Sequence, residues 1–144
     1  MRKKLLLILI VITILNIVGC SKTNTQEKRE EDMKEIKVII NDIEYNINLE
    51  ENETAKEFIK MLPKEYTMNE LNGNEKYTYL DKSLPTDSYN PNQINKGDVM
   101  LFGDNCLVIF YKTFNTNYSY TKIGHIDNLQ DLDNNNIKVK FTRD

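Results

Sequence analysis

A run of six apolar residues, Cys-Leu-Val-Ile-Phe-Tyr from Cys106 to Tyr111, constrains the fold of this chain more than any other segment. Successive side chains of a strand point to opposite faces of the sheet, so a strand that is apolar at every position must be covered on both sides. Gly103-Asp104-Asn105 precedes the run, and the segment from Val99 to Phe102 precedes that turn, which indicates a hairpin. The sequence therefore predicts a strand that is buried on both faces.

Alternation of apolar and polar residues predicts further strands on both sides of this hairpin. Segments 36–40 and 43–49 carry apolar residues at every second position. Asn41-Asp42 lies between them and tolerates positive φ, so we expect a tight β-hairpin there. The other expected strands lie around Tyr66 and Met68, at Tyr77 and Tyr79 after an Asn72-Gly73 turn, from Tyr118 to Ile123, and from Ile137 to Phe141.

One helix is expected between residues 54 and 62. Thr54 is expected to cap it, and Glu57 completes a Thr-x-x-Glu capping box. Pro63 then ends the helix. The apolar residues fall on one stripe, at Ala55, Phe58, Ile59 and Leu62. We expect this stripe to pack on the hairpin or to plug the end of a barrel.

The segment from Asp81 to Gly97 shows no regular pattern and contains Pro85 and Pro91 among asparagine, aspartate and serine. Loops of this length are usually functional or are packed by their own side chains. Few helices and many short strands favour a closed barrel, which also removes exposed sheet edges. We therefore expect residues 35–144 to form one mainly β domain, a small closed barrel of about eight strands with one clear α-helix.

The N-terminus has the pattern of a lipoprotein signal peptide. Met1-Arg-Lys-Lys precedes an apolar run from Leu5 to Val18, and Gly19 stands before Cys20. The run is shorter than the ~20 apolar residues of a membrane-spanning helix, although a transmembrane anchor is the alternative. In the bacterial lipoproteins that this segment resembles, cleavage before the cysteine leaves its thiol carrying lipid. We therefore expect residues 1–19 to be the signal peptide and Cys20 to be lipidated.

Residues 20–34 are expected to be the lipidated cysteine and a flexible tether, because this charged segment lacks the apolar residues of a core. A short charged helix from Glu27 to Met33 is the alternative. These features predict a protein that is lipid-anchored at the extracytoplasmic face of a bacterial cell membrane. Loss of residues 1–19 would change the net charge from -3 to -6, so we expect no nucleic-acid partner. Lipidation would also leave Cys106 without a disulfide partner.

Residues 54–63, 68–77, 97–103, 106–112 and 118–124 together carry a resemblance that extends from about Glu35 to Phe141. In these segments the chain resembles the bacterial cyclophilin-like domain family. The resemblance implies a small cyclophilin-type β-barrel. The family is largely without an assigned biochemical role, and a fold alone does not establish a function.

True cyclophilins are peptidyl-prolyl isomerases, and the groove of those enzymes is built around an arginine with histidine, glutamine and aromatic groups. This chain has no tryptophan, and its arginines are Arg2, Arg29 and Arg143, all outside the expected core strands. Lysine does not reproduce the planar bidentate donor of arginine. We therefore expect no ordinary cyclophilin mechanism. The alternative is a divergent prolyl cis-trans isomerase that binds a twisted peptide bond without arginine.

Nucleophilic catalysis is incompletely supported. Ser119, His125 and Asp127 could supply a triad, but no Gly-x-Ser-x-Gly elbow surrounds the serine. Cys106 with His125 could supply a thiol nucleophile, but burial in a doubly apolar strand raises the pKa of a thiol and makes it inert. We therefore assign no catalytic residue and expect His125 to be a surface or loop histidine.

Metal binding is incompletely supported as well. Asp131, Asp133 and Asn135 follow the spacing that begins a calcium-binding loop. The required glycine and glutamate are replaced by Asn136 and Thr142, so the segment fails as an EF-hand. One histidine and one spare cysteine do not make a zinc site. We expect neither a metal nor a cofactor.

Aromatic and amide side chains form the remaining candidate site, because ligand pockets combine such groups. Tyrosine and phenylalanine are also ordinary strand residues that pack or face solvent, and this alternative stays open. The leading hypothesis is a lipid-anchored, non-catalytic module that binds a peptide or small ligand in a shallow groove. The candidate groove residues are Asn72, Tyr77, Tyr79, Phe102, Asn105, Tyr111, Phe114, Tyr118 and Tyr120.

Overall fold

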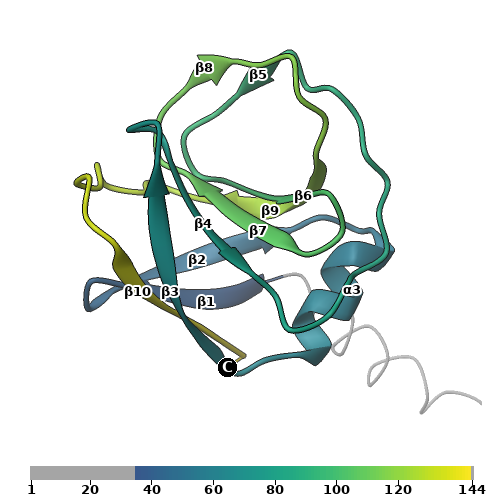
Figure 1. The fold of residues 1–144 in the computed structure, drawn as a ribbon. Coiled ribbons are helices and arrows are strands. Elements are labelled where there is room, and N and C mark those ends of the chain that lie inside the picture. The colour runs from purple at the N-terminus through teal and green to yellow at the C-terminus, as the bar shows by residue number, and fades with distance from the viewer. Residues whose placement is uncertain (1–34, 144) are drawn as a thin grey trace, which may run out of the picture. The chain divides into compact units, whose positions relative to one another are not determined.

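The structure is a computed structural model, and it describes residues 35–143. The expected signal peptide, Cys20 and the expected tether lie outside the described residues. Eight antiparallel strands of the described segment close into a barrel in the order β1-β10-β3-β4-β7-β6-β9-β2 (Figure 1). This confirms the expected mainly β barrel. Because the segment closes its own sheet and contains its own apolar core, it has the features of an independently folding domain.

Each of the eight barrel strands overlaps one of the segments that the sequence predicts to be a strand. Two further short strands pair with each other outside the barrel, at the end of two long excursions (Figure 1). The barrel strands are β1 (Glu35–Ile40), β2 (Ile43–Leu49), β3 (Lys64–Leu71), β4 (Glu75–Tyr79), β6 (Asp98–Phe102), β7 (Cys106–Phe110), β9 (Thr121–Ile126) and β10 (Ile137–Thr142). The outer pair is β5 (Gln93–Ile94) and β8 (Phe114–Asn115).

Tight turns set the register of the predicted hairpins. Asn41 and Asp42 have φ of 50° and 64°, and β1 pairs with β2 on either side of them as expected. Asn72 and Gly73 have φ of 57° and 68° at the turn between β3 and β4. Asparagine, aspartate and glycine tolerate this left-handed region, so the local sequence determines where these hairpins reverse.

Strand β7 is buried on both faces, as the sequence predicts. Leu107, Ile109 and Tyr111 point into the barrel, where they join the inner core with residues of every barrel strand except β4. The alternate residues point outward and belong to a second apolar group, which we call the outer cluster. The outer cluster consists of Ile94, Met100, Cys106, Val108, Phe110 and Tyr120, with Tyr77 and Phe114 packed against it.

The two excursions cover this outer face. Ile94 of β5 is fully buried in the outer cluster, and Phe114 of β8 packs on Phe110 with ring centroids 5.7 Å apart. Backbone hydrogen bonds in both directions between Tyr89 and Tyr120 join the two excursions. Segment 81–97 is therefore a long loop, as expected, apart from the two residues of β5, and it packs on the barrel through Leu84 and Ile94. The expected strand at 118–123 begins later, because β9 starts at Thr121.

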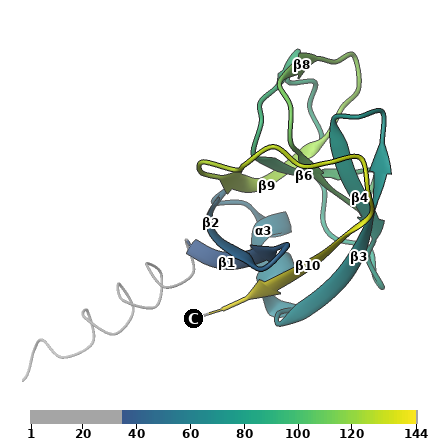
Figure 2. The ribbon, with the colours of Figure 1, turned by 90° about the vertical axis from the view of Figure 1, so that its left-hand side faces the viewer.

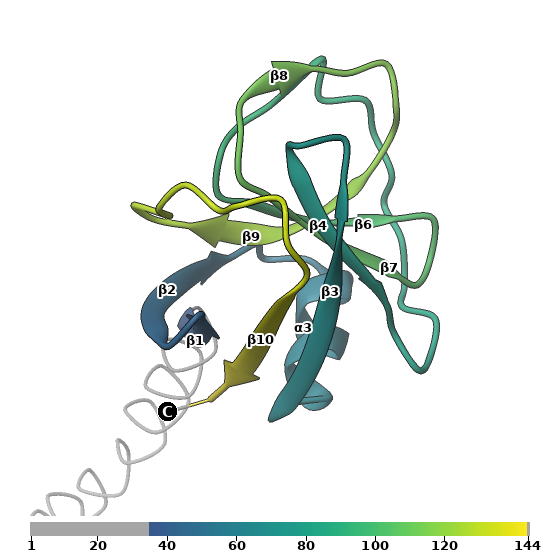
Figure 3. The same ribbon diagram turned by 60° about the vertical axis from the view of Figure 1, so that its left-hand side comes forward.

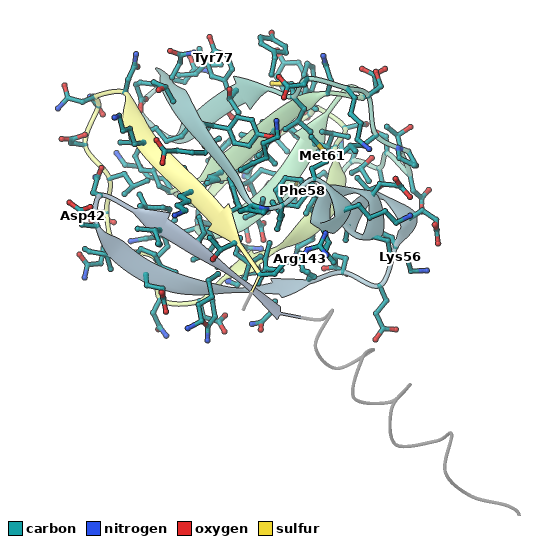
Figure 4. The ribbon with its side chains drawn as sticks, turned by 90° about the horizontal axis from the view of Figure 1, so that it is seen from below. Asp42, Lys56, Phe58, Met61, Tyr77 and Arg143 are labelled. Atoms are coloured by element: carbon teal, nitrogen blue, oxygen red, sulfur yellow. The ribbon has the colours of Figure 1, made fainter. Side chains whose placement is uncertain are left out.

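Helix α3 (Glu53–Lys60) lies against one end of the barrel, on the side away from β5 and β8 (Figures 2 and 3). Phe58 lies on the barrel side of the helix and Lys56 on the outer side (Figure 4). The Phe58 ring packs edge-on against Phe141 at 5.2 Å between centroids. The expected apolar stripe therefore plugs the barrel end. No helix of the described segment has the length and apolarity that crossing a membrane requires.

The expected helix cap is wrong by two residues. Asn52 is the N-cap, and its side-chain oxygen accepts a hydrogen bond from the Ala55 backbone N–H at 2.8 Å. Thr54 is buried instead, and its hydroxyl donates to the Pro85 carbonyl at 2.7 Å. Glu57 pairs with Lys60 rather than with the start of the helix. The Thr-x-x-Glu pattern is local, whereas the Thr54 hydroxyl bonds to Pro85 of a distant loop.

Replacing the cap tests this assignment. We expect Asn52→Ala to lower the free energy of unfolding by about 1 to 2 kcal/mol. The Ala55 N–H loses its acceptor at the helix start, and the Lys122 carbonyl loses the Asn52 amide as a donor. Glu57→Gln is the matched control, and it should leave stability nearly unchanged because Glu57 does not bond the helix N-terminus. Urea unfolding of both variants measures the difference. A larger loss from Glu57→Gln than from Asn52→Ala would contradict the cap.

Candidate functional site

A pocket of about 340 Å³ opens on the outer wall of the barrel. The β3–β4 hairpin forms one side, β7 forms the floor, and Phe102, Tyr118 and Tyr120 form the other side. The tip of that hairpin rises beside the β5–β8 excursions (Figures 2 and 3). We call this the aromatic pocket. It is lined by Leu71, Asn72, Glu75, Tyr77, Tyr79, Phe102, Cys106, Val108, Tyr118 and Tyr120.

Exposed apolar side chains concentrate at the aromatic pocket. Six large hydrophobic side chains of the described segment are exposed, and four of them line it: Leu71, Tyr79, Phe102 and Tyr118. Tyr79 and Tyr118 are the most exposed, at 65% each. Contiguous exposed apolar surface on a soluble domain usually marks an interaction site. The volume lies at the lower end of the range for small-molecule pockets.

The rings of the pocket form two groups. Tyr77 and Tyr79 of β4 pack edge-to-face with centroids 6.0 Å apart. On the other side, Phe102 packs edge-to-face on Tyr118 at 6.1 Å and in a tilted arrangement on Tyr120 at 5.6 Å. Neighbouring rings restrain one another in such clusters, so the pocket walls are largely pre-formed.

Glu75 supplies the one charged side chain among the described residues that line the pocket. Burial raises the pKa of its carboxyl group, and the negative charge of Glu70 raises this pKa further. No hydrogen bond or ion pair within the described segment engages the Glu75 carboxylate. A desolvated, unpaired carboxylate in a pocket is a candidate functional group, because burying a charge without a partner is costly.

Cys106 lies on the pocket floor and is only 8% exposed. Burial raises the pKa of its thiol, and the charge of Glu75 raises it further. Burial likewise raises the pKa of the Tyr120 hydroxyl. A thiol that stays protonated is a poor nucleophile, which agrees with the expectation of an unreactive cysteine.

Six of the nine residues predicted for the groove meet at this pocket, and three lie elsewhere. Asn105 sits in the β6–β7 turn, where its carbonyl accepts from the Leu80 N–H. Phe114 lies on β8 of the outer pair and packs against Phe110. Tyr111 is fully buried and faces the barrel interior. These three assignments are corrected. Tyr111 alternates with the outward-facing residues Val108 and Phe110, and therefore faces the interior. Asn105 and Phe114 lie in a turn and on the outer strand β8, outside the pocket lining.

Pattern reading missed Leu71, Glu75, Cys106 and Val108 as lining residues. The signal for Glu75 was present, since it stands two residues before Tyr77 and therefore shares its face of β4. Val108 and Cys106 share the outer face of β7 in the same way. Leu71 had no such signal, because the β3–β4 turn determines whether its side chain reaches the pocket.

A buried ion pair closes the barrel end opposite α3. The fully buried Lys76 ammonium donates to the Glu70 carboxylate at 2.5 Å and to the backbone carbonyls of Asp133 and Asn135 at 2.5 and 2.7 Å. The Tyr111 hydroxyl donates to Glu70 at 2.9 Å. Burial and the bond to the negatively charged Glu70 raise the pKa of Tyr111 to about 12. This network satisfies every participant from within the fold, which indicates a structural role.

His125 belongs to a separate polar cluster on β9. Its Nδ1 lies 3.1 Å from the buried Asp98 carboxylate, and its Nε2 lies 3.8 Å from Asp127. Lys122 also approaches Asp98, at 3.3 Å. No hydrogen bond within the described segment joins Ser119 to His125. The hydrogen-bond partner of the His125 imidazole is thus Asp98. The candidate triad of Ser119, His125 and Asp127 is not assembled.

The residues of the failed calcium motif and the C-terminal arginine have other partners. Asp131 pairs with Lys96, and the Asp133 carboxylate accepts hydrogen bonds from the Asn135 backbone and side chain. Arg143 donates to the Ile59 carbonyl at the end of α3. Figure 4 shows Arg143 beside α3 and well separated from Tyr77 of the aromatic pocket.

Comparisons with known proteins agree with this architecture. The family described as the cyclophilin-like family matches residues 38–142. Among solved structures, the solution structure of a hypothetical protein from Archaeoglobus fulgidus is similar, with a TM-score of 0.53 and 19% identity. That similarity covers 77% of this chain and 95% of the archaeal chain, and it concerns the fold alone. No curated protein matches the chain significantly.

The Glu70–Lys76 pair predicts a pH-dependent contribution to stability. Burial acts to raise the pKa of Glu70, but hydrogen bonds from Lys76, Tyr111 and the Gly73 N–H together lower it below its ordinary value near 4.5. Its stabilisation is therefore present above the unfolded-state pKa and lost as pH falls through the lower folded-state pKa. We expect Glu70→Gln to cost about 2 to 3 kcal/mol at pH 7, because it leaves Lys76 buried without a counter-charge.

Urea unfolding of the wild type and Glu70→Gln at pH 7 and at several values below 4.5 measures this difference. The gap between the two proteins should narrow only in the acidic range. A gap that is already absent at neutral pH, or that widens in acid, would contradict the assigned role of the pair.

Proposed function

The chain belongs to the cyclophilin-like family, and from this premise we propose that its barrel is a non-catalytic binding module that holds a peptide or small ligand in the aromatic pocket. The observation that carries the proposal is the concentration of exposed aromatic and apolar side chains around a pocket of about 340 Å³. Folding alone gives no reason to expose Tyr79, Phe102 and Tyr118 together, whereas ligand binding does.

The contents of the pocket favour recognition over chemistry. Its thiol stays protonated, because burial and Glu75 raise the pKa of Cys106. The His125–Asp98 pair and the Lys76–Glu70 pair are engaged elsewhere in the fold. The aromatic rings and the unpaired Glu75 carboxylate remain, and such a lining binds and orients a ligand.

The proposal includes the location of the protein. The N-terminal pattern and Cys20 support a lipoprotein that is anchored at the extracytoplasmic face of a bacterial cell membrane. Lipid chains contribute about 0.8 kcal/mol per buried methylene, so two or more chains anchor a protein stably. A tether of residues 20–34 would then hold the pocket within reach of ligands near the membrane surface.

Lipidation is tested by metabolic labelling with a fatty-acid analogue in a bacterial host. We expect the wild type to be labelled and to sediment with membranes, because the Cys20 thiol is the acceptor of the lipid. Cys20→Ala should lose the label, whereas Cys106→Ala, which changes the buried cysteine, should keep it. Equal labelling of wild type and Cys20→Ala would remove the anchor from the proposal.

Ligand binding is tested by isothermal titration of the domain of residues 35–144 with peptide and metabolite libraries. We expect saturable binding that weakens at least about tenfold in Phe102→Ala, since loss of one central aromatic contact costs more than about 1.4 kcal/mol. Tyr89→Ala is the control, because Tyr89 is exposed but lies outside the pocket. Absence of saturable binding by any ligand would contradict the module.

A proline-limited refolding assay with the same domain distinguishes a binding module from a prolyl isomerase. We expect no acceleration of the slow phase. Acceleration that persists through repurification and disappears in Phe102→Ala would instead establish the divergent isomerase.

A further inference from the structure

We propose that the aromatic pocket binds an ammonium cation, with the cationic group held among the rings and facing the Glu75 carboxylate. This inference rests on the proposed function, because it names the ligand class for the same pocket. The ammonium group belongs either to a small quaternary amine or to a lysine side chain of a peptide. Both carry a compact positive charge on an apolar stem.

Aromatic rings stand on both sides of the pocket. Tyr77 and Tyr79 stand on one side of the pocket, and Phe102, Tyr118 and Tyr120 stand on the other. Aromatic rings carry partial negative charge on their faces and attract ammonium groups within about 6 Å. Rings from both sides therefore surround a space that suits a cation, and several rings acting together define a cage rather than a single contact.

The pocket also contains an unpaired carboxylate. Glu75 is half-buried on the strand that carries Tyr77 and Tyr79, and no hydrogen bond or ion pair within the described segment engages it. Glu75 lines the pocket together with Cys106 and Tyr120. Its negative charge raises the pKa of both of these groups. A bound cation would supply the missing counter-charge and offset the cost of desolvating Glu75.

The contrast with Glu70 strengthens this reading. Glu70 also lies in the β3–β4 region, and the fold gives it Lys76 as a partner at 2.5 Å. Lys76 is the very next residue after Glu75, but it points to the barrel interior because neighbouring strand residues face opposite sides. Lys76 therefore neutralises the Glu70 carboxylate inside the barrel, and the Glu75 carboxylate stays unpaired at the pocket.

Other ligand charges fit the pocket less well. No lysine, arginine or histidine is among the described residues that line it, so an anion would meet Glu75 without a positive partner. A neutral apolar ligand would bury the carboxylate further without pairing it. A metal ion would find one carboxylate among aromatic rings, which is too few oxygen ligands for calcium or magnesium.

Matched pairs of probes test the charge requirement. Choline is compared with 3,3-dimethylbutanol, in which a carbon replaces the quaternary nitrogen, and N-acetyl-lysine methylamide is compared with its ε-acetylated form. Binding to the domain of residues 35–144 is followed by amide chemical shifts of the pocket strands at low salt. We expect the cation of at least one pair to saturate and its neutral counterpart to bind about tenfold or more weakly.

The arms of this experiment also distinguish the two sources of the cation. Preference for choline assigns the pocket to small quaternary amines. Preference for the lysine derivative assigns it to peptide side chains. Either result supports an ammonium site, whereas equal binding of the neutral and cationic members of both pairs would overturn it.

Glu75→Gln provides the decisive variant, with Glu65→Gln as its control. Glu65 lies on the adjacent strand β3, is exposed and does not line the pocket. Glu65→Gln therefore changes the net charge by the same amount without changing the pocket lining. We expect Glu75→Gln to weaken cation binding about tenfold or more and Glu65→Gln to leave it unchanged. Unaltered affinity in Glu75→Gln would overturn the proposal.

Thermal unfolding without ligand shows whether Glu75→Gln loses binding only because the substitution destabilises the fold. Because burial raises the pKa of Glu75, the folded state disfavours its ionised form, and the neutral amide should not lower the melting temperature at pH 7. A variant that loses binding while keeping its melting temperature identifies a binding residue. Loss of binding through unfolding would show a lower melting temperature and would count against the assignment.

The rings are tested by replacing aromatic character at similar apolar size. Tyr79→Leu and Tyr118→Leu should weaken binding of the cation more than binding of its neutral counterpart, and Tyr89→Leu outside the pocket should not. If neutral library ligands bind the pocket but no ammonium probe does, the inference fails and the proposed function stands. If neither class binds, both fail.

Discussion

Strand β7 is apolar on both faces, and the rest of the structure depends on how those two faces are covered. The inner face completes the barrel core, while the outer face would be left in water by a barrel alone. Burying several large side chains there is worth about 1.5 to 3 kcal/mol for each. That gain explains why two long excursions, with β5 and β8 at their ends, fold over the outside of the wall instead of extending into solvent.

The cover over this face is incomplete, and the aromatic pocket is the place where it ends. Ile94 and Phe114 of the excursions cover Phe110, whereas Cys106 and Val108 line the pocket floor. The rim is made by the β3–β4 hairpin and by the return of the chain through Tyr118 and Tyr120. A packing requirement of one strand thus places aromatic side chains from distant segments around one opening, which is the arrangement on which both proposals rest.

Sequence patterns predicted much of the fold, because strand alternation and turn residues act locally. The Asn41-Asp42 and Asn72-Gly73 turns, the doubly apolar strand and the helix stripe are each encoded within a few neighbouring residues. The cap of α3 was misassigned because the Thr54 hydroxyl is used by Pro85, thirty-one residues away. Tyr111 was misassigned because a strand that is apolar at every position does not reveal which of its residues face the barrel interior.

The sequence by itself determined that this chain forms a mainly β barrel with one helix, since hydrophobic periodicity and tight turns are properties of adjacent residues. Only the tertiary structure decided which side chains meet. Closure of the sheet brings Glu70 to Lys76 inside and leaves Glu75 outside, although all three lie within seven residues. Strand alternation and barrel closure assign a face to each of these charges, and the fold then supplies a counter-charge on one face and not on the other.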